Sequence, residues 1–518
     1  RFSHLPPGTY KVSASTAGFK TAVGDPVSLG VAQLVTFDLE LEIGALASEV
    51  IVRGGPPMLG STASELGSQA TQTEFHTWPI FIEDGQRHLQ TFIFSSMPGT
   101  EGDTFEGTIN GGQAFSHEIL IDGLTLGRFN LTGGSLNQFS PSVDATSEFR
   151  LQTGTLSAQY GATQTAVANF VMKSGSNQYH GSLYWFHLNS ALRAHTWAEN
   201  LYDLDKSRWL ENNWGGTFGG PLRLPGYRGQ DRSHLFVSYE RDDLDSLRPV
   251  GSVSLPIRAF KQGDFSALFD PVFTGDGLSG TVVGQDALGR DVRFGQIYDP
   301  STARQLADGS WLLDPFPGNF IPAGRFSKVS SNILELADTP DPILPGLQRN
   351  YPRVSGVPFK KQDLFSIKVD HQISENHKLS GFFLLTNRNL ATAGVSARYL
   401  PYPGSASSAW FNSGNDGRLL RISEDWTISS TTLNHVAFGY NRFVDDVYSA
   451  HAGEDWPQRI GLEGVGQTTF PWIRFSGPSP TLTGSYAYLG NLQSNHRLNQ
   501  SFVAANDLSL VRGRHTLR

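Results

Sequence analysis

Alternating apolar and polar positions recur through the last two thirds of the chain. The clearest case is DLFSIKVDHQI (363–373), which is followed by SENHK (374–378) and by the returning segment LSGFFLLTN (379–387). A second pair, 420–428 and 434–441, flanks SSTT (429–432). A period of two indicates strands with one apolar and one polar face, and a short polar break indicates a tight turn between antiparallel neighbours. Further strands are predicted at 180–189, 212–222 and 233–243.

The connections distinguish two structures that share this pattern. A soluble sandwich or barrel turns its apolar face inward, whereas an outer-membrane barrel turns it toward lipid. Very short turns (374–378, 429–432) alternate here with long Gly/Pro-rich stretches (244–362, 388–416, 444–500). That asymmetry is typical of outer-membrane barrels. Aromatic residues near strand ends suit the two interfacial girdles of such a barrel; they are Trp185, Tyr239, Trp426 and Tyr440.

The first third of the chain has a different pattern. In residues 1–46, a Pro-Pro-Gly turn precedes alternation at Tyr10, Val12 and Ala14, which predicts the end of a small β-sandwich. Residues 47–72 are rich in Gly, Pro and Ser and are interpreted as a linker. Residues 73–175 mix short helical and strand signals, including SHEILIDG (116–123), PSVDATSEFRLQTG (141–154) and ANFVMKSG (168–175). They predict a compact α+β unit.

Composition narrows the class of protein. The formal net charge of −8 argues against a nucleic-acid partner, since binding phosphates needs a basic surface. The 518 residues include no Cys, which excludes disulfides, thiol catalysis and Cys-ligated metals. The longest apolar runs, such as FFLL (382–385), are far shorter than a spanning helix, so a membrane form would be a β-barrel.

Candidate catalytic and metal-binding motifs are weak throughout. GDGLSG (275–280) fits G-x-G-x-x-G but follows no clear strand and precedes no helix. Neither H-E-x-x-H nor G-x-S-x-G occurs. Neighbouring carboxylates such as Asp242 and Asp243 would point to opposite faces of a strand, so they could not converge on one substrate. We therefore predict no catalytic, cofactor-binding or metal-binding residue and no enzyme activity.

An ordered set of motifs resembles one known family. INGGQ (109–113), ILIDG (119–123), SPSVDATSEFRLQTGTLSAQYG (140–161) and VMKSGSNQYHGSLYWF (171–186) resemble the plug-to-barrel passage of TonB-dependent outer-membrane receptors, in the Oar-like branch. NNWGGTFGGPL (212–222), FPGNFIPAGRFS (316–327) and DLSLVRGRHTL (507–517) continue the match in the family's order. LPPGTYKVSASTAGFKT (5–21) is similar to the end of a carboxypeptidase-regulatory-like sandwich, a relative of carbohydrate-binding folds.

The resemblance implies a fold and its division into domains. The expected fold is mainly β: a truncated transmembrane antiparallel β-barrel (176–518) with an α+β plug domain (73–175). The end of an N-terminal, transthyretin-like β-sandwich (1–46) and a linker (47–72) would precede the plug. Residues 176–518 would supply about ten to fourteen strands, fewer than the roughly 22 of plugged transporters, so the remaining strands are expected beyond Arg518.

The resemblance also implies a mechanism, which is uptake of a substrate across the cell outer membrane. A TonB-type protein of the inner membrane would pull on a strand-forming TonB box ahead of the plug. ASEVIVRG (47–54) lies in that position, with candidate partner-binding residues Glu49, Val50, Ile51 and Val52. The alternative is that this stretch is the last strand of the sandwich or its exit linker. Relatives take up iron chelates, cobalamin, glycans or peptides, and the sequence does not select among them.

Six residues of the expected plug are candidate loop positions that meet the barrel wall or the substrate: Asn110, Gly111, Gly112, Gln113, Asp122 and Gly123. The alternative is ordinary turn chemistry, in which Gly supplies positive φ and Asn or Asp bonds to its own backbone. Two other classes of protein also remain open. One is a surface carbohydrate-binding or adhesion β protein without transport, and the other is a glycan-cleaving enzyme with convergent carboxylates.

Overall fold

The structure is a computed structural model of the whole chain. It describes residues 8–29, 39–44, 49–52, 66–71, 74, 82–83, 86–87, 89–102, 107–126, 139, 141–156, 159–161, 163–201, 206–335, 341–342, 344–393, 410–449, 452–473, 495–513 and 515–517. Residues 53–65, which belong to the predicted linker, lie outside the described residues, as do residues 1–7 and 30–38 of the predicted sandwich.

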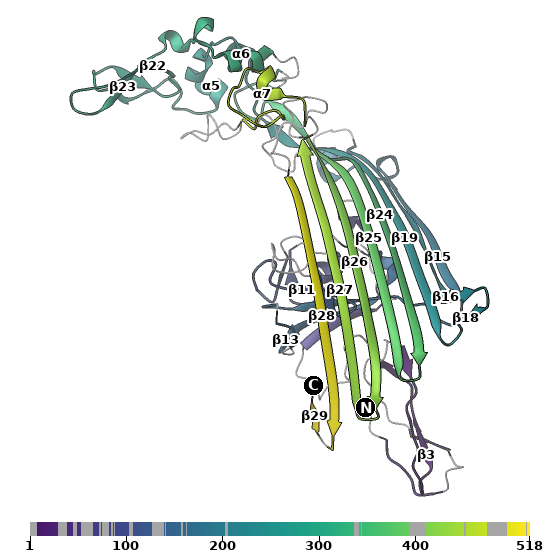
Figure 1. Cartoon of the computed structure of the whole chain (residues 1–518). Helices are drawn as coiled ribbons and strands as arrows, with labels where there is room; N and C mark the ends of the chain where they lie inside the picture. Colours follow the sequence, from purple (N-terminus) through teal and green to yellow (C-terminus); the bar gives the residue numbers. More distant parts are fainter. Residues whose placement is uncertain are drawn as a thin grey trace.

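A single antiparallel sheet, which we call the wall, dominates the molecule (Figure 1). Its order is β15-β16-β19-β24-β25-β26-β27-β28-β29. The strands are β15 His180–Asn189, β16 Arg208–Pro221, β19 Ser233–Val253, β24 Tyr351–Ser374, β25 His377–Ala393, β26 Trp410–Ser429, β27 Thr432–Ser449, β28 Asn495–Arg512 and β29 His515–Leu517. Each pairs with its neighbour in the chain order, so the wall is a meander of long hairpins.

The predicted hairpins are confirmed, but their strands are longer than predicted. The pair β24–β25 turns at 375–376 and the pair β26–β27 at 430–431, within the expected turn segments. Residues 244–253, 351–362, 388–393, 410–416, 444–449 and 495–500 were predicted as loop and are strand. Strands of 17 to 24 residues therefore replace spans of about ten. This length explains why the wall has nine described strands instead of ten to fourteen.

The two faces of the wall differ as the alternation predicts. On one face, large apolar side chains are exposed, including Leu183 at 92% and Phe502 at 71%. The aromatic residues Trp185 and Trp426 are exposed on the same face. Many of the intervening side chains point to the other face and are buried there, including polar ones, as Ser366 illustrates at 2% exposure. An exposed apolar face backed by a buried polar face is the arrangement of a wall that meets lipid.

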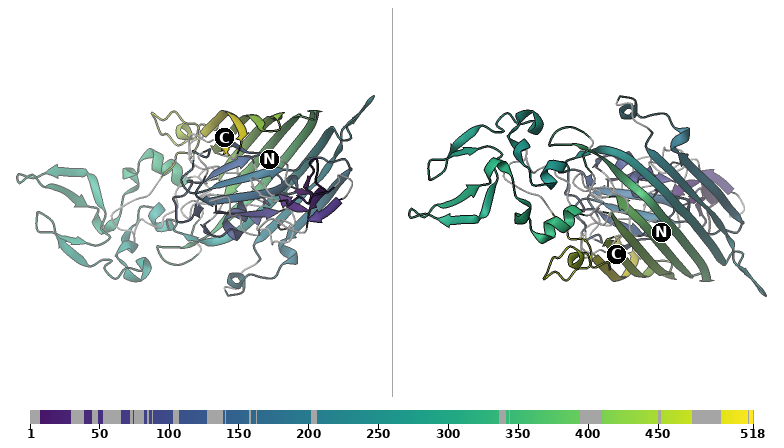
Figure 2. Two further views of the ribbon diagram at one scale, coloured as in Figure 1. Left: turned by 90° about the horizontal axis from the view of Figure 1, so that it is seen from below. Right: turned by 90° about the horizontal axis from the view of Figure 1, so that it is seen from above.

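An inner domain, residues 66–172, packs against the buried face of the wall (Figure 2). Its sheet has the order β12-β11-β14-β13-β6. The strands are β6 Leu66–Thr71, β11 Glu118–Ile121, β12 Leu124–Thr125, β13 Thr146–Gly154 and β14 Val167–Met172, with β11 parallel to β14. The helix α2 Leu89–Ser96 and the 3₁₀ turn η2 Val143–Ala145 complete the domain, together with the two-stranded pairs β7 Ile82–Glu83 with β8 Gln86–Arg87 and β9 Thr100–Glu101 with β10 Thr108–Ile109.

One predicted boundary is wrong. Residues 66–71 were assigned to the linker, but β6 pairs along β13 from Glu148↔Thr71 to Gly154↔Leu66. The alternation of Leu66, Ser68 and Ala70 with small or polar neighbours is short, and its high Gly and Ser content was interpreted as a linker signal. Pairing with a buried central strand outweighs that composition. The described sheet of the inner domain therefore begins at Leu66.

The N-terminal strands form two small sheets. β1 Gly8–Tyr10 pairs with β4 Val27–Leu29, and β2 Ser13–Ala14 pairs with β3 Thr21–Gly24. The candidate box residues form β5 Glu49–Val52, which runs parallel to β3 with the register Thr21↔Glu49 and Gly24↔Val52. They lie near the end of the wall that carries the short turns (Figure 1).

The opposite end of the wall carries a loop domain, residues 254–350, which extends well beyond the strands (Figure 1). Its elements are α4 Arg258–Lys261, η4 Ser266–Phe269, α5 Pro271–Thr274, β20 Val282–Gln285, β21 Asp291–Arg293, β22 Tyr298–Gln305, β23 Trp311–Pro315, η5 Pro317–Asn319, η6 Ala323–Arg325 and α6 Lys328–Glu335. Elsewhere lie η3 Ser190–Leu192, α3 Trp197–Leu201, α7 Trp456–Arg459 and the pair β17 Arg223–Leu224 with β18 Tyr227–Arg228. In the part of the chain that the structure describes, no helix is long and apolar enough to cross a membrane.

Candidate functional site

The turn at Asp122 and Gly123 joins β11 to β12 and points at the wall. Both residues have positive φ, 47° and 80°, which is the backbone of a tight two-residue hairpin turn. Asp122 Oδ1 accepts the backbone N–H of Met172 at 3.0 Å, and the Gly123 N–H donates to Asn169 Oδ1 at 3.1 Å. The positive φ of the turn alternative is therefore present, but Asp122 bonds to the backbone of Met172 on β14 and directs its second carboxylate oxygen toward the barrel strands.

Three wall side chains hold this hairpin; with Asp122 we call them the hairpin anchor. Lys368 of β24 donates to Asp122 Oδ2 at 2.9 Å and to the Met172 carbonyl at 3.0 Å. Arg421 of β26 donates to the carbonyls of Ile121, Leu124 and Thr125, the shortest of these at 3.1 Å. Asn441 of β27 donates to the Leu126 carbonyl at 3.0 Å.

The side chains of the hairpin anchor are largely buried, and because buried charges are poorly solvated, their pairing matters for stability. The side chains of Lys368 and Asp122 are 10% and 18% exposed, and Arg421 is 3% exposed. Removing one partner of such a pair leaves a charge without compensation and typically costs about 3–5 kcal/mol. The anchor therefore couples the position of the inner domain to three strands of the wall, β24, β26 and β27.

A second contact lies on the other half of the wall, around Glu240 of β19. Its carboxylate accepts the hydroxyls of Ser142 at 2.5 Å and Tyr184 at 2.8 Å, and it accepts Asn213 Nδ2 at 2.7 Å. Ser142 belongs to the inner domain, where it also caps η2. Glu240 therefore links the inner domain to β15 and β16 through one fully buried carboxylate.

Arg87 of the inner domain lies beside this contact. It donates to Asp144 at 2.7 Å, and its guanidinium lies over the rings of Tyr184 and Phe186. Burial disfavours the charged form of Arg87, but the carboxylates of Asp144 and Glu240 outweigh burial and raise its pKa. Arg87 therefore stays charged at the interface.

The turn at residues 110–113 does not join the wall contacts. Asn110 and Gly111 have φ of 52° and 70°, again a tight turn, and Asn110 is exposed. Asn110 bonds through its backbone N–H to Gly99 and through its side chain to Thr153, both in the inner domain. The carbonyl of Gln113 accepts both the N–H and the hydroxyl of Ser116. For these residues the observed contacts are those of turn chemistry.

The candidate box residues are backbone-paired on one side only. β5 lies at the edge of the order β2-β3-β5, next to β3. The alternative that this segment is a last strand of the N-terminal sheet is thus consistent with the described pairing. Its other edge has no strand partner among the described residues.

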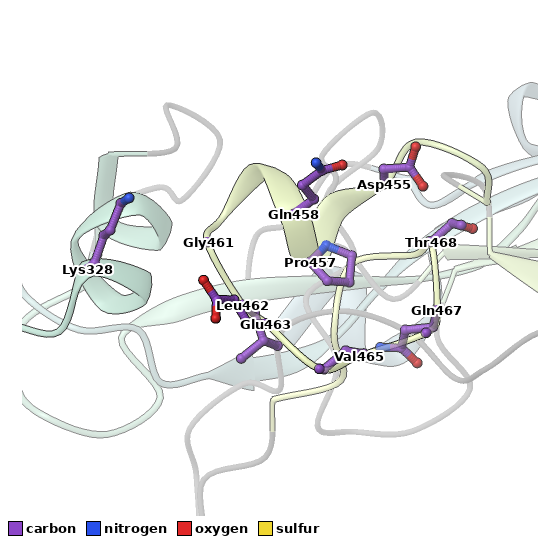
Figure 3. Close-up of a pocket in the computed structure, with 12 residues that line it drawn as sticks. Lys328, Asp455, Pro457, Gln458, Gly461, Leu462, Glu463, Val465, Gln467 and Thr468 are labelled. Atoms are coloured by element: carbon purple, nitrogen blue, oxygen red, sulfur yellow. The ribbon is translucent and has the colours of Figure 1, made fainter.

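A cleft of about 620 Å³ lies among the loops at the far end of the wall (Figure 3). Lys328 of α6 contributes from the loop domain, and the remaining lining comes from residues 455–468 around α7. Below it, Ile460 and Phe470 are buried and pack against Val329 and Ile333 of α6. The lining is largely polar, with Asp455, Gln458 and Gln467 among its side chains. It faces the side from which the long loops emerge.

Within the described residues, no group of three or more His, Asp or Glu side chains is arranged to hold a metal ion. The sequence analysis did not single out Lys368, Arg421, Asn441 or Glu240. A signal for them existed: each lies at an inward position of an alternating strand, where a charged or amide side chain must meet either water or a buried partner. The partners lie in the inner domain, far away in sequence, so no spacing could have identified them.

His117 gives a pH-dependent prediction for the inner domain. It is 3% exposed beside the ring of Phe94, and burial lowers its pKa to about 4. In the unfolded chain the imidazole of His117 takes up a proton near pH 6.5, whereas in the folded domain it does so only near pH 4. Stability is therefore unaffected above pH 6.5 and falls as the pH drops from 6.5 to 4, by about 3 kcal/mol in total. Chemical denaturation of the inner domain at pH 7.5 and pH 4.5 should show this loss, and His117→Phe should reduce it.

Comparison with known proteins places these features in a family. Residues 171–518 match the family model described as outer membrane beta barrel domain. The chain belongs to this outer-membrane β-barrel family, and the wall is its barrel domain. The predicted fold class and the outer-membrane location are confirmed by this match.

The chain also resembles named relatives. It is 26% identical over 230 residues to the TonB-dependent transporter Oar of Myxococcus xanthus, a match covering 43% of this chain and 21% of Oar. This match bears out the resemblance to TonB-dependent receptors of the Oar-like branch. In fold it is similar to the outer membrane transporter YddB of Escherichia coli (11% identity, TM-score 0.45, 86% of this chain and 45% of that chain).

The fold also resembles that of the ferric enterobactin receptor of Pseudomonas aeruginosa (11% identity, TM-score 0.42, 86% of this chain and 46% of that chain). The chain spans about a fifth of the length of Oar and under half of each of the two solved structures. These relatives are named as transporters or receptors and not as enzymes.

Proposed function

We propose that the intact protein is a TonB-dependent outer-membrane transporter, in which the inner domain is the plug. The observation that supports this most is the packing of a separately folded domain against the lumen face of a lipid-exposed wall, held by the hairpin anchor. A barrel blocked in this way passes no large solute at rest, so transport requires a force that moves the blocking domain. No bond of the substrate is made or broken.

The force would be applied at β5. An inner-membrane energy-coupling protein of the TonB type would add a strand to the free edge of β5 or displace β5 from β3. The acidic Glu49 and the β-branched Val50, Ile51 and Val52 suit an extended strand. The short wall turns and β5 lie at the same end of the molecule, which is the end that must face the periplasm (Figure 1). The cleft near Lys328 and Asp455 lies at the opposite end, where substrate arrives.

Site-specific cross-linking tests the coupling. Because residues 1–518 contain no Cys, Val50→Cys introduces a single thiol into this chain. In oxidised cells, we expect it to form a disulfide with a cysteine placed in the strand-pairing region of the coupling protein. Thr21→Cys, on the paired strand β3, is the matched control and should give much less product. Outer-membrane recovery of the protein with no cross-link from Val50→Cys would favour the surface carbohydrate-binding or adhesion alternative.

A further inference from the structure

The two halves of the wall meet the inner domain in different ways. Toward β25–β27, the wall contributes apolar side chains to the core of the inner domain itself. Phe443 lies edge-on to Phe139 of the inner domain, with ring centroids 6.0 Å apart. We call this set the apolar contact; its wall members are Phe382, Leu384, Leu419 and Phe443, all at most 3% exposed.

Toward β15–β24, polar side chains predominate on the buried face, although Phe236, Leu244 and Leu364 are buried there as well. We call this set the polar seam; it comprises Tyr184, Asn213, Ser238, Glu240, Asp242 and Gln362. Apart from Tyr184, each member is at most 2% exposed. The seam carries the carboxylates of Glu240 and Asp242, and Glu211 of β16 lies nearby. Among the described residues, Lys360 is the only ammonium of the wall that interacts with these carboxylates. Arg87 of the inner domain is a second cation beside Glu240, so the seam is acidic by one carboxylate when all of these groups are ionised.

Position along the strands does not explain this contrast. One row of the register runs across the wall through Ser238, Ser366, Leu384 and Leu419. On this row, the hydroxyls of Ser238 and Ser366 bond to each other at 2.6 Å, whereas Leu384 and Leu419 pack into the core of the inner domain. The two halves of the wall differ on this row, although on the neighbouring inward row Leu364 of β24 lies opposite Thr386 of β25.

The polar seam also has unused hydrogen-bonding capacity. Among the described residues, neither amide atom of Gln362 has a hydrogen-bond partner, although Gln362 is 0% exposed. In register with it, Asp242 Oδ2 and Asn213 Oδ1 lack partners as well. A buried polar atom without a hydrogen bond is destabilising, and four such atoms lie in one register row of the seam, compared with Thr386 Oγ1 and Asn441 Oδ1 toward β25–β27. The closed seam is therefore less cohesive than the apolar contact. The same atoms could be satisfied by water or by a polar ligand once the seam opens.

We infer that the inner domain separates from the wall along the polar seam, that cargo passes there, and that the seam favours cargo with hydrogen-bond donors or positive charge. This inference rests on the proposed transport function. The apolar contact stays closed, because separating it exposes the aromatic and aliphatic core of the inner domain to water. Opening the seam hydrates polar groups instead, and it requires breaking the bond between Ser142 and Glu240 and, on β24, the ion pair between Lys368 and Asp122.

Thiol accessibility tests the route without knowledge of the natural cargo. Ser238→Cys is nearly isosteric and places a thiol in the seam, and Leu419→Cys places one in the apolar contact on the same register row. Cells expressing the intact protein, otherwise free of Cys, are treated from outside with a small cationic methanethiosulfonate. Labelling is compared with and without a protonophore. We expect energised cells to label Ser238→Cys severalfold more, and Leu419→Cys to remain unlabelled.

The results of this labelling experiment separate the inferred route from the proposed transport function. Energy-dependent labelling of Leu419→Cys, equal to or above that of Ser238→Cys, overturns the inferred route and leaves transport intact. Labelling that is insensitive to the protonophore at both positions contradicts the proposed function, and the inferred route with it. In isolated outer membranes under mild urea, where no energy is supplied, Ser238→Cys should still react first. The reverse order in urea would contradict the weaker cohesion of the seam.

The charge of the reagent tests the preference for cargo. A cationic and an anionic methanethiosulfonate of similar size should label Ser238→Cys in energised cells at different rates. A wall of one sign raises the local concentration of the opposite charge, so the cation should react about tenfold faster. Asp242→Asn should reduce that ratio without abolishing labelling. Equal rates for the two reagents would overturn the inferred cargo class.

Discussion

Replacing Arg421 with Met should loosen the inner domain and make the outer membrane leaky. Arg421 belongs to the hairpin anchor, and its guanidinium donates to three carbonyls of the β11–β12 hairpin. Hydrogen bonds from a charged group contribute about 1.5–3 kcal/mol each, so the loss is expected to be about 3 kcal/mol or more. Cells carrying Arg421→Met should become sensitive to a large hydrophilic antibiotic, and the inner domain in membrane vesicles should become protease-sensitive.

The same strand supplies the control for this prediction. Arg418 lies three residues earlier on β26, points to the opposite face and has a half-exposed side chain paired with Asp416. Arg418→Met removes the same charge without touching the inner domain and should leave permeability unchanged. Equal leakage from the two variants would show that the effect comes from the wall and not from the hairpin anchor.

The fold was predictable where its cause is local. A period of two and a short polar break determine a hairpin within about twenty residues, and so the turns at 375–376 and 430–431 were found. Strand length was not predictable in the same way. Residues 244–253 and 351–362 have no clear alternation, and they are strand because they extend the ladder between β19 and β24.

The site depends on contacts between residues that are far apart in the sequence. Asp122 and Lys368 are 246 positions apart, and Asp122 on its own is indistinguishable from any turn aspartate. Glu240 lies in an alternating strand where a carboxylate is compatible with a water-filled lumen. Only the inner domain, placed against the wall, shows that it is buried and bonded to Ser142.

The lipid-facing assignment of the wall gives the second large prediction. Phe383 of β25 lies on the outward face between Ile367 and Leu420 of the neighbouring strands. An Arg on the lipid face near the bilayer midplane costs about 2–4 kcal/mol, and the cost falls to about 0–1 kcal/mol near an interface.

Phe383→Arg should therefore destabilise the protein folded in lipid vesicles, lowering its free energy of unfolding by about 2–4 kcal/mol. Asn387→Arg, four residues further along the same face and next to Asp363 and Asp416 in register, should have little effect. Denaturant titrations read out by heat-modifiable gel mobility measure both variants. If Phe383→Arg were as well tolerated as Asn387→Arg, that face of the wall would meet water, and the apolar alternation would need another explanation.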